Sequence, residues 1–150
     1  MIGAQIRYAR LGYWARRPLY GFTNDHIKTR EGKRCVLEPN ETEAPLAIKI
    51  FELRARNMME GIEIVEQINK LGFRTMERVV RDKDDRTKIV KVIGGDPLTL
   101  KQLWRMVENP VYAGVNDEKW TQGQPVKCQF KGLVSFDLFN AANRGKMVLS

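Results

Sequence analysis

The stretch LTLKQLWRMVENP, residues 98–110, predicts a short amphipathic helix with well-defined ends. Thr99 is a good N-cap, because its side-chain oxygen can accept a hydrogen bond from a free backbone N–H of the first turn. Asn109-Pro110 ends the helix near Glu108, since the residue before a proline avoids helical geometry. The spacing gives two faces, with Leu100, Leu103, Trp104 and Val107 inward and Lys101, Gln102 and Arg105 outward.

A second helix and a hairpin precede this segment. Gly72 is a good C-terminal stop for residues 61–71, whose apolar stripe at helical spacing is Ile62, Ile64, Val65, Ile68 and Leu71. Residues 73–95 then change to β-branched side chains around a polar run, which predicts a hairpin with Asp84-Asp85 at its tip. Helix, hairpin and helix together predict an expanded, winged-helix-like helix-turn-helix whose second helix enters the major groove of DNA.

The remaining segments predict an α+β domain that is mainly helical and carries β-hairpins. The firmest of the other helices follows Pro39, with Asn40 as its N-cap and Leu46, Ile50, Phe51 and Leu53 on one stripe. No linker divides the chain. The other expected elements are the end of a helix at 2–11, a hairpin of 22–27 with 34–37, short strands at 112–115 and 126–130, and a helix from Ser135 to Asn143.

Charge is distributed unevenly along the 150 residues, whose formal net charge is +8. Residues 1–34 hold eight Lys and Arg against two acids, and residues 70–109 hold ten against six. Residues 35–69 have the opposite balance, with three bases against seven acids. An excess gathered into two blocks indicates a basic face suited to a polyanionic partner, whereas evenly spread charge would only aid solubility.

Three groups of basic side chains are candidate DNA contacts. On the helix 99–108, Lys101 and Arg105 can reach phosphate or guanine, and Gln102 can pair with adenine. Arg74 and Arg78 lead the basic hairpin, which could grip the flanking backbone as a wing does. The third group is Arg7, Arg10, Arg16 and Arg17, interleaved with Tyr8, Tyr13 and Trp14. Each group has an alternative interpretation. For the helix 99–108 it is a solvated helix face, for the hairpin a charged edge, and for the N-terminal group core aromatics with a basic rim.

The residues speak against an autonomous enzyme. His26 is the single histidine, so a two-histidine metal site or a histidine-based triad within this chain is excluded. Cys35 and Cys128 are too few for a four-ligand zinc site and predict two inert thiols in a reducing compartment. Gly94-Gly95 lacks the lysine of a phosphate loop. We therefore expect no catalytic residue, no metal, no cofactor, no membrane segment and an intracellular, cytoplasmic location.

An ordered set of segments resembles a known family. They are GYW (12–14), PLYGF (18–22), EPNETEA (38–44), IKIFEL (48–53), INKLG (68–72), LWRMVENPVYAG (103–114) and GLVSFDLF (132–139). Together they resemble the recombinase domain of large serine recombinases, the site-specific integrases of mobile elements. The resemblance spans nearly the whole chain, and NPVYAG is its most specific part.

The resemblance implies a DNA-binding module of a bacterial integrase. It implies that residues 1–11 end a long helix from a catalytic domain with the nucleophilic serine, that 12–145 form the DNA-binding domain, and that 146–150 begin a linker to a zinc ribbon. The implied partners are double-stranded DNA at an attachment site and those two domains. The module itself is expected to be a nucleoid-associated monomer, and the parent a dimer or tetramer on DNA.

Two departures from the family pattern stand out. Pro18 lies one place early, and Phe22 replaces a tyrosine, so no tyrosine hydroxyl is available there. The hairpin 73–95 is longer than in many members, and the acids at its tip would repel phosphate, so we expect its tip to point away from DNA. Two rival functions are a protein-interaction domain with an acidic helix toward its partner and a free-standing winged-helix transcription regulator.

Overall fold

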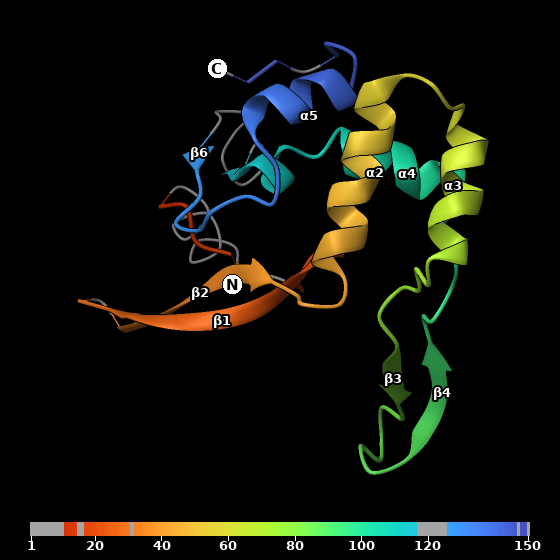
Figure 1. Cartoon of the computed structure of the whole chain (residues 1–150). Coiled ribbons are helices and arrows are strands. Elements are labelled where there is room, and N and C mark those ends of the chain that lie inside the picture. The colour runs from red at the N-terminus through yellow and green to blue at the C-terminus, as the bar shows by residue number, and fades with distance from the viewer. Residues whose placement is uncertain (1–10, 15–16, 31, 117–125, 147, 150) are drawn as a thin grey trace.

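The computed structural model describes residues 11–14, 17–30, 32–116, 126–146 and 148–149. It confirms the α+β class, with small antiparallel hairpins around a group of helices (Figure 1). The described helices are α2 (Ala44–Arg56), α3 (Gly61–Lys70), α4 (Leu100–Val107) and α5 (Phe136–Ala142), with a 3-10 turn, η1, at Pro110–Ala113. The strands pair as β1 (Phe22–Thr29) with β2 (Gly32–Pro39), β3 (Arg78–Arg81) with β4 (Ile89–Ile93), and β5 (Val115–Asn116) with β6 (Val126–Lys127).

Helix α2 begins later than its sequence signal predicts. The Asn40 side chain accepts hydrogen bonds from the backbone N–H groups of Thr42 and Glu43, so it closes a turn ahead of the helix. The N-cap is Glu43, and Pro45 lies in the first turn, where its missing N–H removes no helical hydrogen bond. The prediction of Asn40 as N-cap is therefore wrong by three residues, while the buried stripe of Ile50, Phe51 and Leu53 is confirmed.

Aromatic side chains join the distant segments of the core. The ring of Tyr112 on η1 lies 5.6 Å from that of Phe22 on β1 and 5.4 Å from that of Phe51 on α2. Phe51 in turn lies 6.1 Å from Phe139 on α5. Phe22, Phe51 and Phe139 have no exposed surface. Burial of this apolar area supplies most of the driving force that holds the first hairpin, α2, η1 and α5 together.

The 3-10 turn corrects the strand expected at 112–115. Asn109 caps η1 by accepting a hydrogen bond from the N–H of Val111, and Gly114 ends it in the left-handed region. Tyr112 therefore lies in a helical turn, and the strands are limited to Val115–Asn116 and Val126–Lys127. The Asn-Pro dipeptide both stops α4 and starts this tighter turn.

Helices α3 and α4 are held together across the hairpin that separates them. The Asn69 side chain donates to the Leu98 carbonyl at 3.1 Å and accepts from the Leu98 N–H at 2.7 Å. The predicted order of helix, hairpin and helix is confirmed, with Thr99 as the α4 N-cap. The apolar assignments are wrong at three positions, since Ile62, Leu71 and Leu100 are exposed. Each lies at a helix end, where the core no longer covers the apolar stripe.

Candidate nucleic-acid interface

Helix α4 presents a basic, uncovered side. Lys101 and Arg105 are exposed, one helical turn apart, while Leu103, Met106 and Val107 on the opposite side are buried in the core. Trp104 is half-buried, and the Arg54 guanidinium stacks 4.3 Å from its ring centroid. The buried face fixes the rotation of the helix, so the two cations are held outward by packing.

A groove of about 590 Å³ runs beside this basic side. Its α4 wall carries Lys101, Gln102 and Arg105, and its other wall is the loop with Leu19 and Tyr20. The groove is therefore formed by α4 together with a segment about 80 residues earlier in the chain. Its remaining lining residues are Thr99, Met106, Asn109 and Tyr112.

The loop wall, residues 17–21, is fixed on three sides. The buried Tyr112 hydroxyl donates to the Tyr20 carbonyl at 2.7 Å, and Glu43 Oε1 accepts from the Gly21 N–H at 2.9 Å. The Tyr20 ring lies 4.0 Å from that of Phe73. Burial, followed by the charge of Glu43, raises the pKa of the Tyr20 hydroxyl to about 12, so this hydroxyl stays protonated and able to donate. The loop is a preformed surface.

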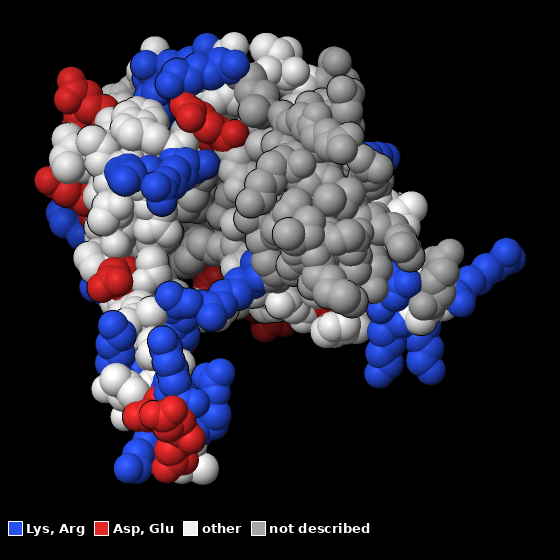
Figure 2. Space-filling view, turned by 180° about the vertical axis from the view of Figure 1, so that it is seen from behind, with Lys and Arg blue, Asp and Glu red and all other residues white. Residues whose placement is uncertain are grey.

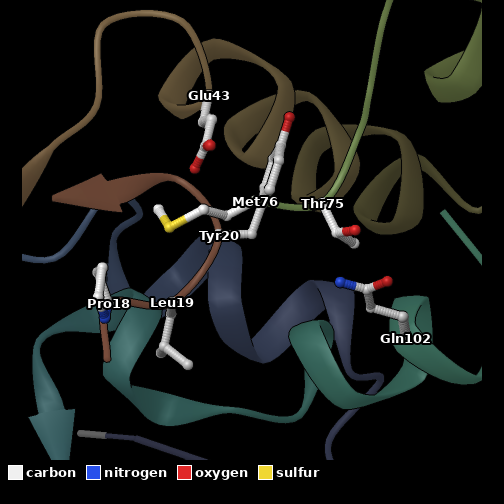
Figure 3. Close-up of a pocket in the computed structure, with 7 residues that line it drawn as sticks. All are labelled: Pro18, Leu19, Tyr20, Glu43, Thr75, Met76 and Gln102. Atoms are coloured by element: carbon white, nitrogen blue, oxygen red, sulfur yellow. The ribbon is translucent and has the colours of Figure 1, made fainter. Parts of the chain in front are cut away.

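Gln102 points toward this loop. Its amide faces Thr75 at the edge of a smaller pocket of about 140 Å³ that Tyr20 also lines, as Figure 3 shows. The side chain is half-buried, whereas Lys101 and Arg105 are exposed. The prediction that these side chains point outward is thus confirmed for Lys101 and Arg105. It is only partly confirmed for Gln102, because the loop and Thr75 flank its side chain. Gln102 lines both hollows and sits where they meet.

The β3–β4 hairpin extends from the body beyond α3 (Figure 1). Arg74 and Arg78 are exposed near its base, and the Arg74 guanidinium donates to the Phe73 carbonyl. At the tip, Asp82 accepts from the N–H groups of Asp84 and Asp85, and hydrogen bonds from Thr87 lower the pKa of Asp85. Acidic and basic side chains are mixed at the tip (Figure 2), and at the base the exposed acids Glu77 and Asp96 accompany Arg74 and Arg78.

The N-terminal group of candidates is only partly described. Arg7, Arg10 and Arg16 lie outside the described residues, and Arg17 is exposed. Trp14 is 3% exposed and its ring N–H donates to the Arg17 carbonyl at 2.9 Å. The alternative reading, core aromatics with a basic rim, therefore describes Trp14 and Arg17.

Sequence reasoning did not assign the loop wall or Thr75 to the site. A Pro-x-x-Gly pattern at 18–21 signals a turn, but not which helix that turn faces. Thr75 closes the base of the hairpin by accepting from the Asp96 N–H through its hydroxyl. Both contributions depend on contacts between residues far apart in sequence.

The two thiols are poorly suited to chemistry. Burial raises the pKa of Cys128 to about 12, and burial followed by the charge of Asp25 raises that of Cys35. Within the described ranges, no group of three or more His, Cys, Asp or Glu side chains could hold a metal ion. None of the described helices is long and apolar enough to cross a membrane.

Comparison with solved structures identifies the fold. A crystal structure of a large serine recombinase–DNA complex matches with a TM-score of 0.61 at 18% identity, covering 96% of this chain and 37% of that chain. The chain shares its fold with part of a large serine recombinase. A structure concerned with the sequence requirements of the Listeria innocua prophage attP site matches with a TM-score of 0.63 at 18% identity, covering 96% and 49%.

These matches confirm the resemblance to the recombinase domain at the level of the fold. The chain spans less than half the length of either matched chain. No protein-family model matches the sequence, and no curated protein sequence matches it. The likeness is one of architecture, with most side chains changed.

Proposed function

We propose that this chain binds duplex DNA as the DNA-binding domain of a serine site-specific recombinase, at one half of an attachment site. The observation that carries the proposal is the uncovered basic side of α4 beside a preformed groove, on a fold shared with a DNA-bound recombinase. Helix α4 lies in the major groove, as the second helix of a helix-turn-helix does.

The candidate residues have separate roles in this proposal. Lys101 and Arg105 contact phosphate or guanine, and Gln102 reads a base from the edge of its pocket. Arg17, Arg74 and Arg78 contact the flanking backbone, together with Arg7, Arg10 and Arg16. Glu43 lines the smaller pocket, where its carboxylate accepts a hydrogen bond from the Gly21 N–H.

The rest of the expected organisation belongs to the same proposal. Residues 12–145 are the DNA-binding domain, 1–11 connect it to a catalytic domain with the nucleophilic serine, and 146–150 lead toward a zinc ribbon. This domain supplies no catalytic residue, and the parent acts as a dimer or tetramer on DNA in the bacterial cytoplasm. That the matched chains are much longer than this one supports a multidomain parent.

The test is fluorescence anisotropy with a pool of random duplexes over a salt series. The wild type is compared with Lys101→Ala/Gln102→Ala/Arg105→Ala and with a control, Lys83→Ala/Thr87→Ala/Lys88→Ala, near the tip of the β3–β4 hairpin. We expect binding that weakens as salt rises, with a slope of about −5 to −7 for about six to eight phosphate contacts. The α4 variant should lose most of its sequence-selected binding and the control little.

Two results would reject the proposal. If the wild type binds no duplex even at low salt, the basic side serves solubility, and the interaction-domain alternative becomes the better one. If the α4 variant and the control weaken binding equally, α4 is not the DNA-contacting helix.

A further inference from the structure

The β1–β2 hairpin carries a second basic surface, which none of the contacts proposed above uses. Lys28, Arg30 and Lys33 are exposed near its tip. Lys28 lies directly opposite Lys33 in the register, and like charges in that position destabilise a hairpin. An anion bound beside the two ammonium groups would relieve this repulsion.

Two of the three acids of this hairpin lie away from its tip, and the third, Glu31, lies outside the described residues. Among its described residues the carboxyl groups are Asp25 and Glu38, nearer the base, and they hydrogen-bond with each other. Figure 2 shows Lys and Arg side chains gathered at the end of this arm. In the sequence, residues 28–34 hold four bases and one acid, whereas residues 81–88 at the β3–β4 tip hold four bases and three acids.

The arm is an ordered extension of the groove wall. At its tip the Thr29 hydroxyl donates to the Gly32 carbonyl at 2.8 Å, and the strands pair along their whole length. At its base Phe22 is fully buried and packs on Tyr112, which lines the groove beside α4. A rise of about 3.3 Å per residue puts Thr29 about 23 Å from Phe22.

We propose that the tip of the β1–β2 hairpin binds the DNA phosphate backbone at a point separate from the α4 contact. This inference rests on the proposed function and extends it with a second contact. Phosphate is the ligand because three cations without a shaped pocket suit a repeating anion better than a small molecule. The contact positions the domain and reads no bases.

The test compares two variants of equal net charge on a duplex enriched by the wild type. One is Lys28→Gln/Arg30→Gln/Lys33→Gln, and its control at the β3–β4 tip is Lys83→Gln/Arg86→Gln/Lys88→Gln. Each phosphate contact contributes about 0.9 to the slope of log K against log salt, so the β1–β2 variant should lose about 2 to 3 from the slope. Its affinity near 0.1 M salt should fall at least about 10-fold, and the control should change little.

Binding to a shortened duplex tests the β1–β2 phosphate contact independently. As the duplex is shortened stepwise from the hairpin side, the first loss of wild-type affinity should be absent from the β1–β2 variant. Equal slopes for the two variants, with the wild type still binding, would overturn this inference and leave the proposed function standing. A wild type that binds no duplex would overturn both.

Discussion

Asn69 and Leu98 are joined by two hydrogen bonds although 29 residues separate them. The Asn69 amide satisfies both the N–H and the carbonyl of Leu98, one residue before the α4 N-cap. The direction in which α4 leaves the hairpin is therefore set from the last turn of α3. A primary amide is needed, because it alone among side chains of this size both donates and accepts in this geometry.

We expect Asn69→Ala to lower the free energy of unfolding by about 2 kcal/mol, from the two lost hydrogen bonds. Asn69→Asp should be at least as harmful, since a carboxylate can accept from the Leu98 N–H but repels the Leu98 carbonyl. Urea unfolding followed by tryptophan fluorescence measures both. Stability within about 0.5 kcal/mol of the wild type for Asn69→Ala would show that the pair does not hold α4.

Gly132 and Gly72 form a matched pair of substitutions. A Cβ on Gly132 would lie 2.4 Å from the Ala113 carbonyl carbon and 2.6 Å from the Tyr112 carbonyl oxygen, so the backbone beside the groove must move. Gly72 has open space but a φ of +107°. We expect Gly132→Ala to cost about 3 kcal/mol or more and Gly72→Ala about 1 to 2 kcal/mol, measured by thermal unfolding. Equal costs would contradict this account.

Asp25 and Glu38 make the stability of the β1–β2 hairpin depend on pH. Their hydrogen bond raises the pKa of Glu38 above its usual 4.5 and lowers that of Asp25 below its usual 3.8. The stability that Glu38 contributes is complete below pH 4.5 and is lost as pH rises through its raised pKa. The stability that Asp25 contributes is complete above pH 3.8 and is lost as pH falls through its lowered pKa. Both contributions are complete together between about pH 3.8 and 4.5, so the hairpin is most stable near pH 4.

Glu38→Gln should remove the loss of hairpin stability toward neutral pH, because the amide at position 38 can donate a hydrogen bond to Asp25 at every pH. We expect slower amide hydrogen exchange over residues 22–39 at neutral pH in this variant than in the wild type, after correction for intrinsic rates. The control is Glu41→Gln, an exposed acid in the turn before α2. Identical protection in wild type and Glu38→Gln would mean that the two carboxyl groups do not interact.

The two thiols should differ in reactivity. Burial raises the pKa of Cys128 to about 12, and that of Cys35 is also raised, so little thiolate exists at neutral pH. We expect iodoacetamide to label Cys35 slowly in the folded chain and Cys128 only after unfolding, as read by mass spectrometry of peptides. Rapid labelling of Cys128 under native conditions would contradict its burial.

The sequence predicts those features that depend on neighbouring residues. Thr99 and Ser135 are N-caps as predicted, because each bonds a backbone N–H three residues later. The prediction of Asn40 as the N-cap is wrong because α2 begins at Ala44, with Pro45 in its first turn. Asn40 instead caps a separate turn ahead of the helix. The candidate cations Lys101 and Arg105 lie outward for the same local reason, the period of the helix.

The groove could not be predicted from local pattern. Its second wall depends on the bond from Tyr112 to Tyr20, across 92 residues, and the position of Gln102 depends on Thr75 from the hairpin base. Helical periodicity places Gln102 on a face but does not show what lies against that face. The prediction that Leu100 points inward is wrong for a similar reason. It lies on the apolar stripe, but at a helix end that the core does not cover.

The central claim is that α4 reads DNA sequence, and selection from a random duplex pool tests it most directly. The wild type is compared with Gln102→Arg, and with Glu66→Gln, which makes the same charge change at an exposed site on α3. We predict an enriched motif for the wild type, a change from adenine to guanine at one position for Gln102→Arg, and no change for Glu66→Gln. No enriched motif, or the same motif for all three proteins, would contradict the claim.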